Sequence, residues 1–302
     1  MTSLSPALSG IRARGGRLRS YVALTKPRII ELLLVTTVPT MFVAKGGVPS
    51  LRLIAATLVG GALAAGGANA INMVVDRDID SVMHRTRHRP LVTGEVTPTA
   101  ALVFAVGLEI LAFAELWSSV NLLSAVLAVS ATLFYVFVYT LWLKRTSRQN
   151  IVIGGAAGAV PVLVGWSAVT GHLGWAPLIL FAVIFIWTPP HFWALAIRYR
   201  DDYEAAGVPM MPVVATIERT ASEIIVYTAA LVATTLLFAP VAHMGLLYTA
   251  AAVVLGGLFL AYAVRLLRER TAAAAIGLFR YSITYLTLLF VAMAADVLVR
   301  LH

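Results

Sequence analysis

Three oxygen-bearing side chains recur at a spacing of four residues between Asn72 and Asp80, in the stretch Asn-Met-Val-Val-Asp-Arg-Asp-Ile-Asp. A helix turns by about 100° per residue, so each step of four drifts by only about 40°, which places Asn72, Asp76 and Asp80 on one helical face. Carboxylates stacked in this way repel each other, and a divalent cation removes that penalty. Oxygen-only ligands favour magnesium over zinc. The spacing therefore predicts a magnesium site, and a solvated helix end is the alternative; Asp78 is expected to face solvent or Arg77.

The loop that follows carries positive charge. It reads His-Arg-Thr-Arg-His-Arg-Pro from residue 84 and contains Arg85, Arg87 and Arg89. Guanidinium groups bind phosphate oxygens in a forked geometry, so arginines beside metal-binding carboxylates suit a magnesium–diphosphate complex. The alternative is that these arginines only mark a cytoplasmic loop.

A second acidic group lies further along the chain, in Arg-Tyr-Arg-Asp-Asp-Tyr from residue 198 to residue 203. Asp201 and Asp202 are expected on the same side of the membrane as Asp76, so the two acidic groups would form two walls of a metal–diphosphate cage. For each basic residue nearby, the alternative is that it only determines the membrane topology. The substrate-binding candidates on this side are Lys26, Arg28, Lys144, Arg148, Arg198 and Tyr203.

The elements that position these side chains are predicted to be membrane-spanning helices. Of the 302 residues, 60% are hydrophobic and 12% are charged, a balance that a water-soluble domain does not show. Crossing a bilayer takes roughly 20 apolar residues, so we expect an all-α polytopic protein with about nine transmembrane helices around a central cavity. The expected spans are 29–44, 52–75, 98–118, 120–142, 151–169, 175–196, 220–240, 244–265 and 274–298.

Charge and cysteine content narrow the possibilities further. The basic residues behind the net charge of +9 lie in alternate loops. This pattern indicates membrane topology and excludes nucleic-acid binding. It also predicts that the N-terminus and the active site are cytoplasmic. Residues 1–20 are predicted to be a disordered basic arm, the start of an interfacial helix being the alternative, and residues 21–302 a single domain. The first span can act as an uncleaved anchor. Because cysteine is absent, disulfides and thiolate sites are excluded.

Several stretches together resemble the membrane prenyltransferases related to the 4-hydroxybenzoate polyprenyltransferase, and more narrowly their heme-modifying branch, the protoheme IX farnesyltransferases or heme O synthases. The four-residue acidic repeat is typical of the whole superfamily. The stretches that match the narrower branch are 24–28, 89–91, 150–158, 187–193 (Trp-Thr-Pro-Pro-His-Phe-Trp), 202–212 and 278–283. One departure matters, because many superfamily members carry an Asp four residues before the position of Asp202, where this chain has Arg198.

The resemblance implies a function. It implies farnesyl diphosphate as donor and heme B as acceptor, with heme O and diphosphate as products, in the plasma membrane of a bacterium or archaeon. It also implies Mg²⁺ as cofactor and a heme A synthase or an oxidase assembly factor as partner. The catalytic residues that it implies are Asn72, Asp76, Asp80, Asp201 and Asp202, of which all but Asp201 would be metal ligands.

Three features inside the spans have both a functional and a structural interpretation. His191 follows two prolines expected to break the sixth span, so it is either a heme contact or a histidine bonded to a freed carbonyl. Residues Gly154, Gly155 and Gly158 suit close helix packing or a smooth wall for substrate. The rings of Tyr135 and Tyr139 could face a carbocation or simply pack in the core.

Other functions remain as alternatives. Glu109 and Glu115 lie inside the third span, which would suit a membrane transporter, and the structural alternative for Glu109 is a bond to a neighbouring helix. A heme-binding assembly factor would need no acidic repeat. Within the enzymes, an aromatic-acceptor prenyltransferase of the quinone or chlorophyll type is the alternative.

Overall fold

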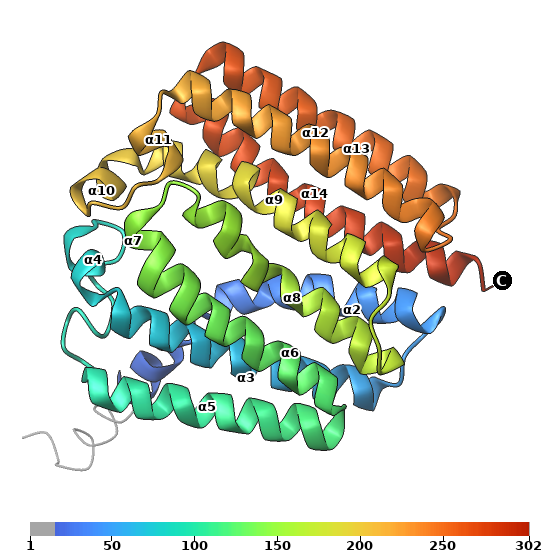
Figure 1. The fold of residues 1–302 in the computed structure, drawn as a ribbon, viewed down its shortest axis with the longest axis horizontal. Coiled ribbons are helices and arrows are strands. Elements are labelled where there is room, and N and C mark those ends of the chain that lie inside the picture. Colours follow the sequence, from blue (N-terminus) through green and yellow to red (C-terminus); the bar gives the residue numbers. More distant parts are fainter. Residues whose placement is uncertain (1–15, 302) are drawn as a thin grey trace, which may run out of the picture.

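The computed structural model describes residues 16–301, except for the side chains of residues 28–34. Long helices run side by side, and short helices gather at one end of the bundle (Figure 1). The long helices are α2 (Pro27–Lys45), α3 (Leu51–Val75), α5 (Pro98–Ser119), α6 (Leu122–Leu133), α8 (Asn150–Thr170), α9 (Trp175–Arg198), α12 (Ile217–Val241), α13 (Leu246–Glu269) and α14 (Ala272–Val299). The short elements are α4 (Arg77–Val82), the π-helix η1 (Phe134–Leu143), α7 (Lys144–Thr146), α10 (Arg200–Ala205) and α11 (Met211–Val214).

The expected membrane fold is confirmed. In the described part of the chain, eight segments are long and apolar enough to cross a bilayer, and one of them combines α6, η1 and α7 as Leu122–Thr146. Helix α2 lies where the first span, 29–44, is predicted. Residues 1–15 of the expected basic arm lie outside the described residues, whereas residues 16–24 are helical. The first and last described residues lie at opposite ends of the bundle (Figure 1).

Most of the long helices begin at a side chain that accepts a hydrogen bond from the first turn. Ser50 caps α3, Thr97 precedes Pro98 at the start of α5, and Thr271 caps α14. Such caps satisfy backbone N–H groups that have no partner inside the helix. They explain why helix starts follow polar residues in otherwise apolar sequence.

Small residues on α3 allow close packing against α5. A Cβ built at Gly60 would lie 2.5 Å from the Leu116 side chain, and one at Gly67 would lie 2.5 Å from Oε1 of Glu109. Glu109 accepts a hydrogen bond from Thr132 of α6 at 3.2 Å. The structural interpretation of Glu109 is therefore confirmed, because its carboxyl joins neighbouring helices.

At the end of the bundle away from the short helices, a buried carboxylate joins α13 and α14. Asp296 of α14 is 2% exposed and accepts hydrogen bonds from the backbone N–H of Gly245 at 2.7 Å and of Tyr248 at 3.2 Å. Arg300 pairs with the same carboxylate at 2.9 Å. Asp296 thus caps the first turn of a helix that is not its own.

Candidate active site

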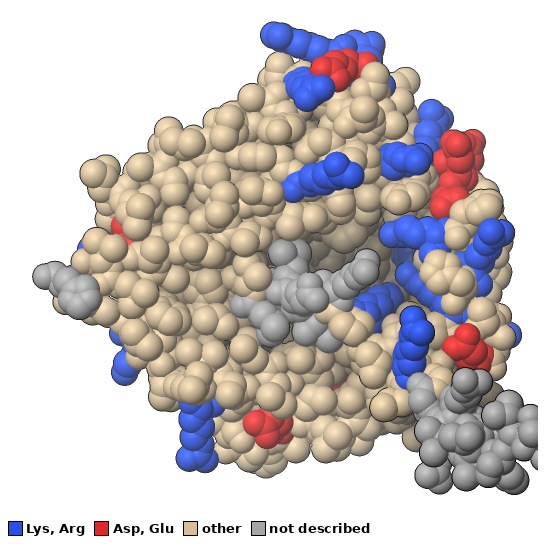
Figure 2. Space-filling view, turned by 180° about the vertical axis from the view of Figure 1, so that it is seen from behind, with Lys and Arg blue, Asp and Glu red and all other residues tan. Residues whose placement is uncertain are grey.

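The residues singled out in the sequence gather at the end of the bundle that carries α4, α7, α10 and α11 (Figure 1). Seen from behind, the molecule is hollowed near this end, and Lys and Arg side chains crowd beside the hollow (Figure 2). Basic groups next to an opening suit an anionic substrate.

Asp76 stands at the junction of α3 and α4. Its backbone has φ −86° and ψ 9°, so α3 ends at Val75 and α4 begins at Arg77. The hydrogen bonds from Asp76 N to Asn72 O at 2.9 Å and from Asp80 N to Asp76 O at 2.8 Å persist across the junction. The Asp76 side chain is fully buried, which is costly for a carboxylate without partners.

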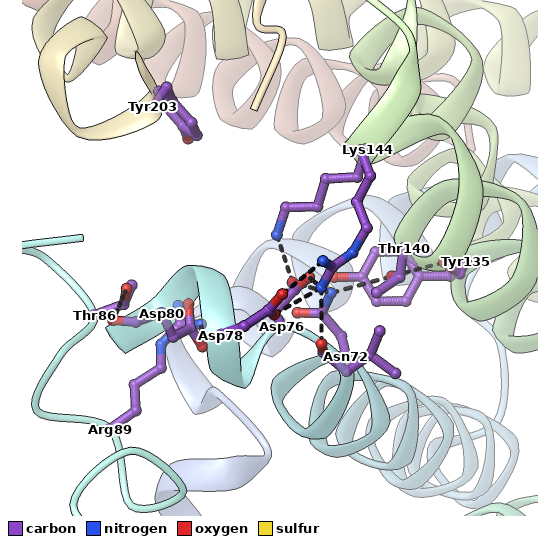
Figure 3. A network of polar contacts seen from close by, with 12 residues as sticks. Asn72, Asp76, Asp78, Asp80, Thr86, Arg89, Tyr135, Thr140, Lys144 and Tyr203 are labelled. Carbon is purple, nitrogen blue, oxygen red and sulfur yellow. Dashed lines mark hydrogen bonds and ion pairs between the residues drawn. The ribbon is translucent and has the colours of Figure 1, made fainter. Parts of the chain in front are cut away.

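The partners of Asp76 come from distant parts of the chain (Figure 3). Lys144 of α7 donates to Oδ2 of Asp76, and so does Nδ2 of Asn72, at 2.7 Å. Nζ of Lys26 donates to Oδ1 of Asn72 at 2.8 Å. Lys26 has the left-handed backbone conformation, with φ 52°, and such backbone strain is concentrated at functional sites in proteins. Burial, with the charges of Arg89 and Lys144, lowers the pKa of Lys26 to about 7.

The other two carboxylates of the segment have separate partners. Asp80 is 2% exposed and pairs with Arg89 at 2.6 Å. Asp78 accepts two hydrogen bonds from Arg145, at 2.7 and 2.8 Å, which hold its pKa at about 2. Asp78 is largely exposed, as predicted, but Arg77 as its partner was wrong, because the guanidinium that reaches it belongs to α7.

The residues around Asp76 fit a hard cation. Oδ1 of Asp76 is buried and has no hydrogen-bond partner, and a carboxylate oxygen is the type of ligand that a hard cation prefers. No group of three or more His, Asp or Glu side chains converges on one point in the described part of the chain. Mg²⁺ often binds one or two carboxylates together with substrate phosphates, so the protein alone need not complete the site.

The second acidic group lies in the first turn of α10. Neither Asp201, which is exposed, nor Asp202, which is half-buried, has an ion pair among the described residues. Tyr203 is buried, and its hydroxyl accepts from Arg85 at 3.4 Å. Figure 3 shows the Tyr203 side chain directed toward the gap that separates α10 from Lys144. The structure therefore shows no direct contact between the two acidic groups within the described residues, and Arg85 connects the loop after α4 to Tyr203 of α10.

The other basic residues predicted for the site make fewer contacts with the rest of the protein. Arg198 lies 5.8 Å from the centre of the Tyr199 ring, and Arg85 lies 5.3 Å from the same ring. Arg87 and Arg148 are exposed and make no ion pair within the described residues. The side chain of Arg28 lies outside the described residues.

Two site residues were missed by sequence reasoning, and both lie in the segment formed by α6, η1 and α7. Thr140 is fully buried and its hydroxyl accepts from Nδ2 of Asn72 at 3.1 Å. Arg145 holds Asp78. The π-helix, which is a frequent feature of functional sites, had no recognisable signal in the sequence, whereas Arg145 was visible only as a loop charge.

The rings of Tyr135 and Tyr139 stack with centroids 5.4 Å apart. Tyr139 lies against Gly154, where a Cβ would come within 2.3 Å of its ring, and Gly155 is closed off in the same way by Thr188. Gly158 has nothing within 4 Å of a built Cβ. The packing role therefore holds for the first two glycines.

His191 lies in a continuous helix. Helix α9 runs through Pro189 and Pro190 without interruption, so the predicted break was wrong; membrane helices tolerate proline where other groups satisfy the freed carbonyls. Nδ1 of His191 is 2.7 Å from Oγ of Ser282, and the ring lies between Trp187, at 4.2 Å, and Phe279, at 4.6 Å. The partner of His191 is thus a hydroxyl on α14, in an aromatic pocket.

Comparisons with known proteins agree with the fold and show the family. The sequence profile of the UbiA prenyltransferase family matches residues 33–294. A protoheme IX farnesyltransferase of Frankia alni is 57% identical over 94% of this chain and 99% of that protein. One of Streptomyces coelicolor is 51% identical over 99% of this chain and 96% of that protein.

Solved structures share the fold at low sequence identity. A structure of digeranylgeranylglyceryl phosphate synthase has a TM-score of 0.77 and 17% identity, covering 93% of this chain and 98% of that one. A UbiA homolog from Archaeoglobus fulgidus bound to GPP and Mg²⁺ has a TM-score of 0.61 and 17% identity, covering 91% and 99%. These likenesses establish the architecture.

Proposed function

The chain belongs to the UbiA prenyltransferase family, and from this premise we propose that it transfers a farnesyl group from farnesyl diphosphate to a vinyl group of heme B. The products are heme O and diphosphate. The chain is an integral membrane protein, and its relatives at 51–57% identity are named for this activity. The observation that carries the proposal is the buried carboxylate of Asp76, which pairs with Lys144 and accepts from Asn72, itself bonded to Lys26, at one end of an apolar bundle.

The reaction begins when the bond between C1 of the farnesyl group and the diphosphate oxygen breaks. The electron pair leaves with the diphosphate, and an allylic cation remains. The π electrons of the heme vinyl group then form the new bond to C1. Water adds to the resulting cation and loses a proton, which leaves a hydroxyl group on the product. These steps require charge stabilisation and exclusion of stray water more than a strong base.

The basic residues of the site are assigned to the departing diphosphate. Lys26, Lys144 and Arg89 carry donors that reach the acidic segment, and the same donors suit phosphate oxygens. Arg85 is assigned a further contact to the diphosphate, which its position between the acidic segment and Tyr203 supports. Other expected phosphate contacts are Arg28, Arg87, Arg148, Arg198 and Tyr203.

Mg²⁺, when bound, supplies Lewis acidity to the leaving group. Asn72, Asp76 and Asp80 would hold it on one wall and Asp202 on the other, with Asp201 beside it. Asp76 is the strongest of these assignments, because one of its oxygens is buried without a hydrogen-bond partner, although Arg145 lies 4.0 Å from it. Dependence on magnesium is thus part of the proposal.

The apolar interior of the bundle is assigned to the farnesyl chain and the heme. His191, in its aromatic pocket, is the proposed heme contact, and the rings of Tyr135 and Tyr139 lie toward the acidic end. The positive loops support an active site on the cytoplasmic face of the plasma membrane. A heme A synthase or an oxidase assembly factor is the proposed recipient of the product.

Mass analysis of heme after incubation of the purified protein with heme B, farnesyl diphosphate and Mg²⁺, with and without chelator, tests the proposal. A magnesium-dependent heme heavier by a hydroxyfarnesyl unit is expected. Release of diphosphate with a phenolic acceptor, and no change in heme, would overturn the assignment of acceptor and indicate an aromatic prenyltransferase.

A further inference from the structure

The orientation of the Asn72 side-chain amide follows from its two charged neighbours, Lys26 and Asp76, because the first donates hydrogen bonds and the second accepts them. The ammonium group of Lys26 only donates, so the amide atom 2.8 Å from it is the oxygen, Oδ1. The carboxylate of Asp76 only accepts, so the atom 2.7 Å from it is the nitrogen, Nδ2. Two charged neighbours therefore determine which way the amide faces.

Thr140 completes this arrangement. Its hydroxyl has one hydrogen, and that hydrogen goes to the carbonyl oxygen of Tyr135 at 2.9 Å. The hydroxyl oxygen can then only accept from Asn72 Nδ2, at 3.1 Å. Both hydrogens of the Asn72 amide are thereby used, one on Asp76 and one on Thr140, and Oδ1 is left facing the lysine. Asn72 is 3% exposed and Thr140 is fully buried, so water has little access to either.

The π-helix sets up this contact. Buried threonines in the α-helices donate to the carbonyl four residues earlier, as do Thr40, Thr57, Thr188, Thr228 and Thr235. Thr140 donates to the carbonyl five residues earlier, which is the register of a π-helix. The same element, η1, leads directly into Lys144, the partner of Asp76. One local change of helix type thus serves both Asn72 and Asp76.

We propose that Thr140 is a positioning residue that holds the Asn72 amide with its nitrogen toward Asp76 and its oxygen toward Lys26, and that orients the Asp76 carboxylate through this amide. The inference rests on the proposed function, because it assumes that a divalent cation binds beside Asp76. Without the hydroxyl, one buried N–H of Asn72 loses its partner, and the amide is less restrained. Groups that orient a metal ligand typically contribute about 10–100-fold to metal affinity.

The test uses the full chain in detergent and measures binding directly. Mn²⁺, followed by electron paramagnetic resonance, replaces Mg²⁺, in the presence of a farnesyl diphosphate analogue whose bridging oxygen is sulfur. Thr140→Val should weaken Mn²⁺ binding by about tenfold, whereas Thr140→Ser, which keeps the hydroxyl, should bind within about twofold of wild type. Thr228→Val is the matched control, because Thr228 is equally buried and its hydroxyl bonds only to its own helix.

Coupling between Thr140 and Asn72 distinguishes a positioning role of Thr140 from a purely structural one. In an Asn72→Ala background, Thr140→Val should cause no further loss of Mn²⁺ affinity, since the amide through which Thr140 acts on Asp76 is gone. Thr140→Ala serves as a second variant if Thr140→Val does not fold. The inference would be overturned if Thr140→Val bound Mn²⁺ with wild-type affinity, or if the Asn72→Ala and Thr140→Val losses of affinity were independent in the double variant. Either result would leave the proposed function standing. A wild-type protein that binds no Mn²⁺ with the analogue would overturn the magnesium proposal and the inference with it.

Discussion

Replacing Asp76 by alanine should damage both stability and catalysis, and the structure separates the two effects. The carboxylate is fully buried and is paired with Lys144, whose side chain is 15% exposed. In Asp76→Ala, the ammonium group of Lys144 loses its counter-ion while remaining mostly buried. Asn72 also loses the acceptor for one of its amide hydrogens.

Removing one partner of a buried ion pair costs about 3–5 kcal/mol, because it leaves an uncompensated charge away from water. Lys144 retains some access to solvent, so the lower end, about 3 kcal/mol, is expected for Asp76→Ala. Catalysis should fall by roughly 10²–10³-fold, which is typical when one group that stabilises transition-state charge is removed.

The double variant Asp76→Ala/Lys144→Met provides the control. A buried ion pair replaced as a whole by apolar groups is often close to neutral for stability. The double variant should therefore recover most of the stability lost by Asp76→Ala. Its activity should stay low, since neither the carboxylate nor the ammonium group is restored.

Thermal unfolding in detergent, followed by circular dichroism, gives the stability, and the rate of heme O formation gives the catalysis. Near wild-type turnover in Asp76→Ala would refute the assignment of the carboxylate to the reacting centre. If the double variant were as unstable as Asp76→Ala, the ion pair would not be the source of the stability.

Four further outcomes are expected. Asp80→Ala should abolish turnover while the protein stays folded in the membrane, and a normal rate of heme O formation would remove Asp80 from the cation site. Arg89→Ala should raise the KM for farnesyl diphosphate by about tenfold, as for loss of a charged hydrogen bond; an unchanged KM would contradict the contact with diphosphate and leave Arg89 as the ion-pair partner of Asp80. His191→Phe should shift the absorption spectrum of bound heme if the imidazole contacts iron, and an identical spectrum would favour a packing role beside Ser282. A chelator should stop product formation, and added Mg²⁺ should restore it; full activity in the chelator would contradict the magnesium proposal.

The fold could be predicted well because apolar length alone marks a membrane span. Every expected span has a helix at its place, and the acidic repeat lies at the end of α3, as hydropathy predicted. The junction between α3 and α4 at Asp76 could not be foreseen, because the four-residue spacing of the side chains is compatible with a single helix. Two prolines in α9 suggested a break that neighbouring helices make unnecessary.

The site could be predicted only in part, because its contacts join residues far apart in sequence. Asn72 and Thr140 are 68 residues apart, and so are Asp76 and Lys144. Local spacing identified the acids, but nothing in it indicated which basic residue each acid would meet. Asp78 illustrates this, because its partner Arg145 lies 67 residues away.

The cap that Asp296 provides for α13 has a consequence for biosynthesis. The first turn of α13 enters the membrane before the residue that satisfies its N–H groups has been made. Tyr248 and Asp296 are 48 residues apart, and at about 5–20 residues per second a ribosome needs roughly 2–10 s to cover that distance. During this interval the start of α13 depends on interfacial water or on the translocation machinery. The hairpin of α13 and α14 therefore reaches its final hydrogen bonding as a unit, late in synthesis.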